Sequence, residues 1–343
     1  MPTQTNEMTR RELMGLLGAL GAAAVVPSGL GFAASEPKPS WKALFGWKGL
    51  PRDVPGFLLA SDLATGGATL LARDGSDAVL IDTKFGNLGP ALAADVRALR
   101  GPRTSLSVIN THHHGDHIGG NAFILTHADH SYAHTNAIER IRSQVELAQW
   151  EATSGVARME KAGAPPDLIA YARIAAESVD QITPESVTPS IPVGEETSLR
   201  FGGSRITLHH FGAGHTDNDL VVVFENHGVI HAGDLVFNGT HPFFFPSGGA
   251  TVIGWLKSLR SLLGICDAKA QVIPGHGPAG DRSIVVAQIE YLERLVEHVQ
   301  REIDTGTPKE NAQEMSWAFM EGLEFGSARP RAIGAVYDEL TGG

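Results

Sequence analysis

The chain has 343 residues, of which 42% are hydrophobic, and this content is ample for a folded core. Its formal net charge of −11 argues against a nucleic-acid partner. A single cysteine, Cys266, excludes an internal disulfide, and its apolar neighbours predict a small buried side chain. The composition therefore favours a globular domain that does not bind nucleic acid.

The first 34 residues predict an export signal. Arg10 and Arg11 precede an apolar run over residues 15–26, and small residues around Ala34 suit signal cleavage, so this region resembles a twin-arginine signal peptide. The run is too short and too rich in Gly and Ala for a membrane span, and residues 16–26 lack the polar face of an amphipathic cytosolic helix. We expect residues 35–343 to work in the periplasm or outside the cell, with no stable membrane span.

The next informative feature is an array of metal-ligand residues at 112–117, directly after an apolar strand-like run. Residues two apart in an extended loop point the same way, so His112 and His114 can share one ion, while Asp116 and His117 face a second ion. His113 then points away, and we expect a supporting role for it. A polar turn is the alternative, but four such ligands in six residues are unlikely to cluster by chance. The array predicts half of a two-metal site.

A long segment without ligand signals follows. Apolar residues recur at helical spacing from Ile138 to Ala148, and Pro165 and Pro166 introduce a second helix that runs to about Val179. We expect residues 136–179 to form a helical insertion near the mouth of the site. Two interpretations stay open, a lid that selects substrates and a packed surface elaboration.

Three more candidate ligands each end an apolar run, where loops supported by a sheet usually carry chemistry. His215 lies between strand-like runs at 206–211 and 220–224. Asp234 follows a short strand and Gly233, a small residue that lets the carboxylate turn inward. His276 follows the run at 270–273. Other histidines, for which we expect structural roles, are His209, His210, His227 and His231.

The loop after Asp234 carries three consecutive aromatic residues, 243–245. They could wall an apolar substrate pocket or plug the core. The candidate pocket residues are Asn238, His241, Phe243 and Phe244. After the last ligand, apolar residues at 285–303 step by three and four, which predicts a helix that covers the sheet and has no catalytic role.

The order of these motifs resembles the metallo-β-lactamase-fold superfamily, over about residues 57–277. The resemblance implies an α/β fold, a four-layer αβ/βα sandwich, in one domain of residues 35–343. It implies one zinc ion held by His112, His114 and His215, and a second held by Asp116, His117 and His276. Asp234 would bridge both zinc ions. Asp82, at the end of an early strand at 79–81, would support the site from behind the ligands.

Two positions bear on the subfamily. The loop that carries His215 is similar to that of β-lactamases that bind their second zinc with cysteine, but Asp234 stands at that cysteine position. Aspartate there resembles glyoxalase II and the acyl-homoserine lactonases. Flavodiiron proteins have glutamate where this chain has His114, so a zinc centre is favoured over redox iron.

The expected function is hydrolysis of a small ester or amide, in particular a lactone or β-lactam-type ring, by water that two zinc ions activate. Asp116 is the expected catalytic residue, because it can orient the nucleophile or pass its proton to the leaving group. Residues 233–254 contain no Lys or Arg, which argues against an anionic thioester. The insertion does carry basic residues, so a glyoxalase II-like thioester hydrolase stays open, as does an accessory metal-binding periplasmic protein of a redox system. The substrate itself and the oligomeric state are not predicted.

Overall fold

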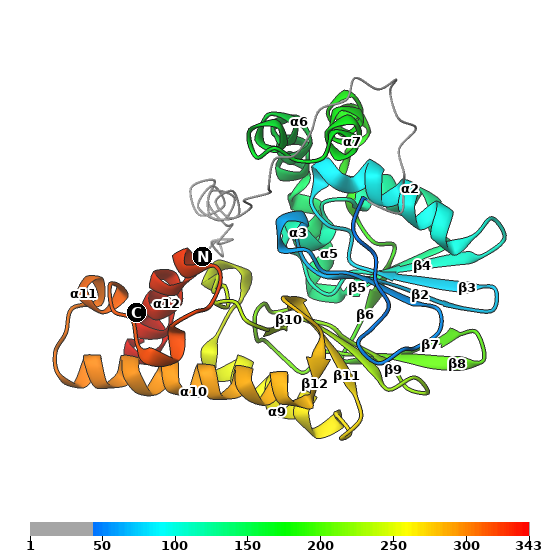
Figure 1. Cartoon of the computed structure of the whole chain (residues 1–343). Helices are drawn as coiled ribbons and strands as arrows, with labels where there is room; N and C mark the ends of the chain where they lie inside the picture. The colour runs from blue at the N-terminus through cyan, green and yellow to red at the C-terminus, as the bar shows by residue number, and fades with distance from the viewer. Residues whose placement is uncertain (1–43, 343) are drawn as a thin grey trace, which may run out of the picture.

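The structure is a computed structural model that describes residues 44–342. Two six-stranded sheets lie face to face, and helices cover the outer face of each sheet (Figure 1). The predicted four-layer α/β fold is therefore confirmed. The proposed signal peptide, residues 1–34, lies outside the described residues. Among residues 44–342, no helix is both long enough and apolar enough to cross a membrane.

The first sheet runs in chain order across its six strands. They are β1 (Phe57–Ala60), β2 (Thr69–Asp74), β3 (Asp77–Ile81), β4 (Ser105–Ile109), β5 (His130–His134) and β6 (Ile191–Val193). β1 to β3 pair antiparallel, whereas β3 to β6 pair parallel. β2 and β3 are covered on both faces, which explains their continuous apolar runs.

The second sheet has the spatial order β12-β11-β10-β9-β8-β7. Its strands are β7 (Glu196–Phe201), β8 (Ser204–His209), β9 (Val221–Phe224), β10 (Val229–Phe237), β11 (Gln271–His276) and β12 (Gly280–Asp281). Only β10 and β11 pair parallel, and their carboxyl ends meet at one edge of the sandwich. Parallel strands present the ends that commonly carry functional loops.

The two sheets bury a shared apolar core. Leu70, Ile81 and Ile109 of the first sheet pack with residues such as Leu208 and Phe224 of the second. Outside the first sheet, α2 (Gly89–Arg100) packs on β2 to β4. Helices α9 (Val252–Ile265) and α10 (Arg282–Asp304) cover the second sheet, and α12 (Arg329–Thr341) packs on α10 (Figure 1). The helix predicted at 285–303 is thus confirmed as part of α10. Cys266 is a free, buried cysteine, as expected.

The segment predicted to be helical at 136–179 forms α5 (Thr135–Ser143), α6 (Val145–Lys161) and α7 (Pro166–Glu177). α6 and α7 pack on each other and on the short helix η3 (Gly86–Leu88) that follows β3. Within residues 44–342, the other helices are short: α3 (Gly115–Ile118), α4 (Asn121–Ile124), α8 (Pro184–Val187), α11 (Lys309–Gln313), and the 3-10 turns η2 (Leu63–Thr65), η4 (Leu125–His127), η5 (Val179–Gln181), η6 (Pro246–Gly248), η7 (Ala318–Met320) and η8 (Gly326–Ala328).

One strand boundary differs from expectation. Asp234 does not follow a short strand but lies inside β10, which continues to Phe237. The pairing of β10 with β11 shifts register on both sides of Gly233. Gly233 has a φ of 53°, a left-handed conformation that glycine adopts easily, and a β-carbon there would lie 2.9 Å from Thr111. This irregularity turns Asp234 toward the first sheet.

Candidate metal centre

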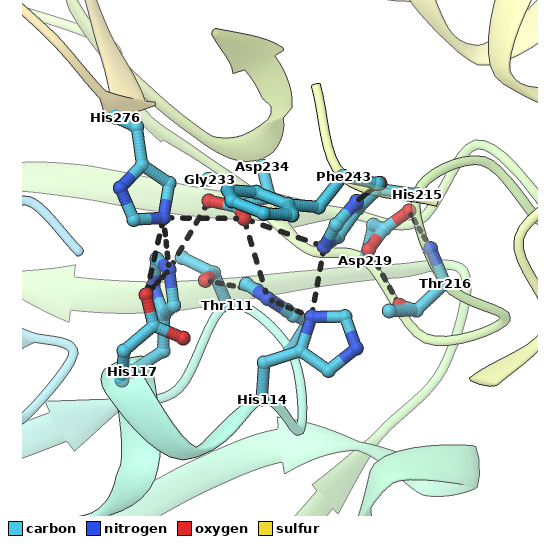
Figure 2. A network of polar contacts seen from close by, with 12 residues as sticks. Thr111, His114, His117, His215, Thr216, Asp219, Gly233, Asp234, Phe243 and His276 are labelled. Atoms are coloured by element: carbon cyan, nitrogen blue, oxygen red, sulfur yellow. Dashed lines mark hydrogen bonds and ion pairs between the residues drawn. The ribbon is translucent and has the colours of Figure 1, made fainter. Parts of the chain in front are cut away.

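The seven predicted ligands come together at one edge of the sandwich, where strands from both sheets end (Figure 2). His112 and His114 follow β4, and Asp116 and His117 lie on the short helix α3. The loop between β8 and β9 carries His215. The ligands from the second sheet are Asp234 of β10 and His276 of β11. All seven are buried.

The first group consists of His112, His114, His215 and Asp234. Nδ1 of His114 lies 3.1 Å from Nε2 of His112 and 2.8 Å from Nε2 of His215. Asp234 Oδ2 lies 3.3 Å from Nε2 of His215. These nitrogen and oxygen atoms surround one point, which is the arrangement of a single-ion site.

The second group consists of Asp116, His117 and His276. Nε2 of His276 lies 3.1 Å from Asp116 Oδ2 and 3.4 Å from Nε2 of His117. Asp234 also reaches this group, because its Oδ1 lies 3.1 Å from Nε2 of His117 and its Oδ2 lies 3.5 Å from Nε2 of His276. Its carboxylate therefore stands between the two groups, at the position expected of a bridging ligand (Figure 2).

The outward-facing nitrogens of three histidines have their own partners. Asp82 Oδ2 accepts a hydrogen bond from His117 Nδ1 at 2.7 Å, and it also accepts one from the Thr111 hydroxyl at 2.8 Å. The same hydroxyl lies 3.0 Å from Nδ1 of His112. The Phe243 carbonyl lies 3.0 Å from Nδ1 of His215. Such bonds fix the ring orientation and leave the other nitrogen free for a metal.

Burial leaves the three histidines of the first group neutral. It lowers the pKa of His112 and His114 well below the ordinary value and the pKa of His215 to about 4. Neutral imidazole is the form that binds metal.

Buried carboxylates favour positive charge at the second group. Burial lowers the pKa of His117 and His276, but Asp234 and Asp116 outweigh burial, so the pKa of His117 is raised and that of His276 reaches about 9. The buried carboxylates thus require positive charge, which protons on these rings or bound cations can supply. The donor set therefore fits a pair of divalent ions.

A glycine makes room for the central carboxylate. A β-carbon on Gly275 would lie 1.8 Å from Oδ1 of Asp234. The glycine before His276 is therefore required for Asp234 to reach both groups.

The remaining histidines lie outside both groups. Nδ1 of His113 lies 2.9 Å from Nδ2 of Asn218, and the His113 carbonyl accepts a hydrogen bond from Gln144 at 2.7 Å. His113 therefore links the ligand loop to its neighbours. The ring of His209 stacks on Phe211, and that of His227 lies against Phe57. His210 contacts the Asp219 carbonyl, and His231 contacts the Ala68 carbonyl.

The aromatic run 243–245 is buried in the core behind the second sheet. Phe244 is 1% exposed and packs on Trp255 in the core behind the second sheet. Phe243 supplies the carbonyl for His215, and its ring stacks on Phe245. Phe245 lies beside His114, with ring centroids 5.1 Å apart. All three rings therefore pack in the core, and those of Phe243 and Phe245 also lie next to the metal groups.

The two other candidate pocket residues bond to the protein itself. Asn238 donates a hydrogen bond from Nδ2 to the Pro278 carbonyl at 2.7 Å. His241 is buried, and its Nδ1 lies 2.9 Å from the Tyr291 hydroxyl on α10. Burial lowers the pKa of His241 to about 4, so it is neutral at pH 7.

The C-terminal region adds residues that the sequence did not single out. Phe325 lies 5.8 Å from the ring of His276 and 5.3 Å from that of Phe243. The Arg331 guanidinium stands 5.0 Å over the ring of Phe245. These residues lie about 50 positions after the last ligand, with no motif around them. Only the tertiary structure shows that Phe325 and Arg331 lie near the metal groups.

Comparison with known protein families gives one decisive match. The profile of the metallo-β-lactamase superfamily matches residues 64–282, which include all seven ligands. The chain belongs to the metallo-β-lactamase superfamily. Phe325 and Arg331 lie beyond the part of the chain that this superfamily profile covers.

The curated relatives that match the chain have low sequence identity to it. The chain is similar to metallo-beta-lactamase type 2 of Bacillus cereus, with 28% identity over 96 residues, and to the protein of the same name from Bacillus sp. (strain 170), with 27% identity over 96 residues. Each match covers 28% of this chain, and the matches span only 38% and 37% of those two superfamily members.

Solved structures support the fold alone. TMB-1 superposes with a TM-score of 0.50 at 18% identity, covering 72% of this chain and 96% of that one. VMB-1 superposes with a TM-score of 0.50 at 16% identity, covering 72% and 97%.

Proposed function

We propose that this superfamily member is a binuclear zinc hydrolase that opens a small cyclic ester or amide, a lactone or β-lactam-type ring. The observation that carries the proposal is the convergence of seven buried nitrogen and oxygen ligands, with Asp234 between the two groups. Imidazole and carboxylate ligands without thiolate suit zinc, and histidine at position 114 argues for zinc over redox iron within this superfamily.

The ligands would divide as the sequence suggested. One ion would be held by His112, His114 and His215, and the other by Asp116, His117 and His276. Asp234 would bind both ions. When bound, two zinc ions supply Lewis acidity toward a carbonyl oxygen and lower the pKa of a water molecule toward neutrality.

Asp116 is the residue we propose to move the proton. Its carboxylate lies 3.1 Å from His276 and 3.6 Å from His117. It can accept a proton from the attacking water and deliver it to the leaving oxygen or nitrogen. In the balanced reaction, a bond forms between the water oxygen and the carbonyl carbon, the ring carbon–oxygen or carbon–nitrogen bond breaks, and the proton passes to the leaving atom.

The surroundings support an apolar ring over a glutathione thioester. Phe243, Phe245 and Phe325 lie beside the metal groups. Several basic residues of the helical segment are engaged within the protein. Arg140 pairs with Asp217, Arg142 with Glu185 and Arg173 with Glu160, and Arg158 stands over Trp150.

A substrate panel tests this function. Zinc-loaded protein is assayed with a chromogenic β-lactam, an acyl-homoserine lactone and S-lactoylglutathione, and kcat/KM values are compared. We expect the ring substrates to be preferred. A clear preference for the glutathione thioester would overturn the assignment of the substrate class. Absence of turnover with all three would favour the second candidate, an accessory metal-binding protein of a periplasmic redox system. Location in the periplasm is itself a proposal, which rests on the twin arginines at positions 10 and 11.

A further inference from the structure

A lysine is fully buried beside the metal centre, and the proposed reaction does not use it. Lys84 follows β3 by three residues and has 0% of its surface exposed. Its backbone has a φ of 65°, in the left-handed region that non-glycine residues rarely adopt. A buried ammonium group and an unfavourable backbone conformation both carry a free-energy cost, so the surrounding structure must compensate for them.

The Lys84 side-chain nitrogen joins the two ends of one loop. Nζ donates hydrogen bonds to the carbonyl oxygen of Ala60 at 2.8 Å and to that of Gly67 at 2.7 Å. Ala60 is the last residue of β1, and β2 begins at Thr69. We call residues 60–68 the β1–β2 segment. Without this side chain, two carbonyl groups would lose their hydrogen-bond partner in the interior, which costs free energy.

The β1–β2 segment lies directly against the second metal group. The Gly67 amide donates to the carbonyl of Asp116 at 3.1 Å, and the Ala68 amide donates to the carbonyl of Gly275 at 2.7 Å. A β-carbon on Gly67 would lie 2.1 Å from the ring of His117. One short stretch of backbone therefore touches two ligands and the residue that precedes the third, His276.

From these contacts we propose that Lys84 is a positioning residue for the second metal group. Its Nζ donors hold the β1–β2 segment closed, and the segment fixes the backbone of Asp116 and the ring of His117. The first group, on the other side of Asp234, has no such contact with Lys84 among the described hydrogen bonds. The inference rests on the metal-binding part of the proposed function and on no particular substrate.

A purely electrostatic role predicts the opposite result. A positive charge close to two divalent ions repels them, so removal of the Lys84 charge would strengthen metal binding. Removal of a positioning residue weakens it. The direction of the change in affinity therefore separates the two roles.

Stepwise zinc titration by calorimetry, with a competing chelator, provides the test. We expect Lys84→Met to weaken the second zinc ion about 10–100-fold while the first ion binds as in the unmodified chain. Lys84→Arg keeps the donors and the charge, and should recover part of the loss. Lys48→Met, at an exposed lysine beside β1, is the matched control and should change neither affinity. Unchanged or tighter binding of the second ion by Lys84→Met would overturn the inference.

A second variant covers the case in which Lys84→Met does not fold. Gly67→Ala keeps Lys84 but adds a methyl group against His117, so it should weaken the second ion selectively. Normal second-ion affinity in Gly67→Ala would also overturn the inference. If the unmodified chain itself binds fewer than two ions, the proposed function fails, and that result is distinct from failure of the positioning role.

Discussion

At the scale of single residues, the ligands depend on polar groups behind them. Asp82 is fully buried and has a φ of 60°, and it accepts hydrogen bonds from the Thr111 amide, the Thr111 hydroxyl and His117. One carboxylate thereby orients a ligand of the second group directly and His112 of the first group through Thr111. Both groups therefore share a single supporting residue.

Replacement of that residue should weaken zinc binding without removing a ligand. Asp82→Asn keeps the shape of the side chain but replaces one acceptor oxygen with an NH2 donor. That donor would face the Thr111 amide, the Thr111 hydroxyl or His117, each of which is itself a donor. We expect zinc affinity to fall about 10–100-fold, with far-ultraviolet circular dichroism unchanged. Equilibrium dialysis against a zinc buffer measures the affinity. Asp77→Asn, at the other end of β3, is the control, and an equal loss in both variants would refute the supporting role.

Asp234→Ala should remove the carboxylate that the two groups share. Because its carboxylate lies between them, the variant should keep its fold, lose the second ion and lose orders of magnitude in turnover of any identified substrate. Elemental analysis and kcat/KM on that substrate are the measurements. Retention of both zinc ions with near-normal turnover would show that Asp234 is only structural.

The ligands could be predicted from the sequence because each ends an apolar run in a recognisable order, and the superfamily motif fixes their roles. Phe325, Arg331 and Lys84 could not be predicted. The positions of Phe325 and Arg331 depend on how the C-terminal region packs, and the role of Lys84 depends on which carbonyl groups face inward. Neither property leaves a local pattern in the sequence.

At the scale of elements, α5 is tied to the loop that carries His215. Arg140 lies 2.5 Å from the Asp217 carboxylate and donates to the Ser247 carbonyl at 3.1 Å. The helical segment predicted from periodicity is therefore connected to the first metal group. Periodicity could reveal the helices, but these contacts join residues more than 70 positions apart.

Arg140→Ala should loosen the His215 loop. We expect a severalfold weaker first zinc ion and a stability loss of at most about 1 kcal/mol, because the pair is about one-third exposed. Arg142→Ala is the matched control, since Arg142 pairs with Glu185 at the surface of the same helix. Zinc titration of both variants decides the point, and equal affinities would show that α5 does not position the loop.

Helix α2 contains a buried carboxyl group whose titration should be visible in stability. Asp95 accepts a hydrogen bond from Trp47 at 2.7 Å, and burial raises its pKa to about 7. The folded protein then holds this proton up to about pH 7, whereas the unfolded chain releases it near pH 3.8. Rising pH between these values therefore favours unfolding through this group.

The amide of Asp95→Asn cannot ionise, so the stability of this variant relative to the unmodified chain should increase from about pH 4 to about pH 7. Above about pH 7 the difference should stay constant, because Asp95 is then ionised in both the folded and the unfolded chain. Urea unfolding of both chelator-treated proteins at several pH values gives the difference. A difference that does not change with pH would mean that Asp95 titrates normally in the fold.

At the scale of the whole molecule, the sandwich brings together ligands from both sheets. The order of the superfamily motifs predicted the four layers. Alternating and continuous runs of apolar residues predicted most of the strands that end at ligands. These patterns misplaced the end of β10, because a bulge at Gly233 lets the strand continue past Asp234. Strand irregularities of this kind depend on the partner strand, here β11, and a single chain segment does not encode them visibly.

The central claim is that this superfamily member holds two ions in the groups that share Asp234. Elemental analysis of protein purified after zinc-sufficient expression tests it most directly. The account predicts about two zinc ions per chain, one for each group of ligands, and about one in His114→Ala, in which the first group loses a ligand. One zinc ion per unmodified chain, or iron in its place, would contradict the binuclear zinc centre.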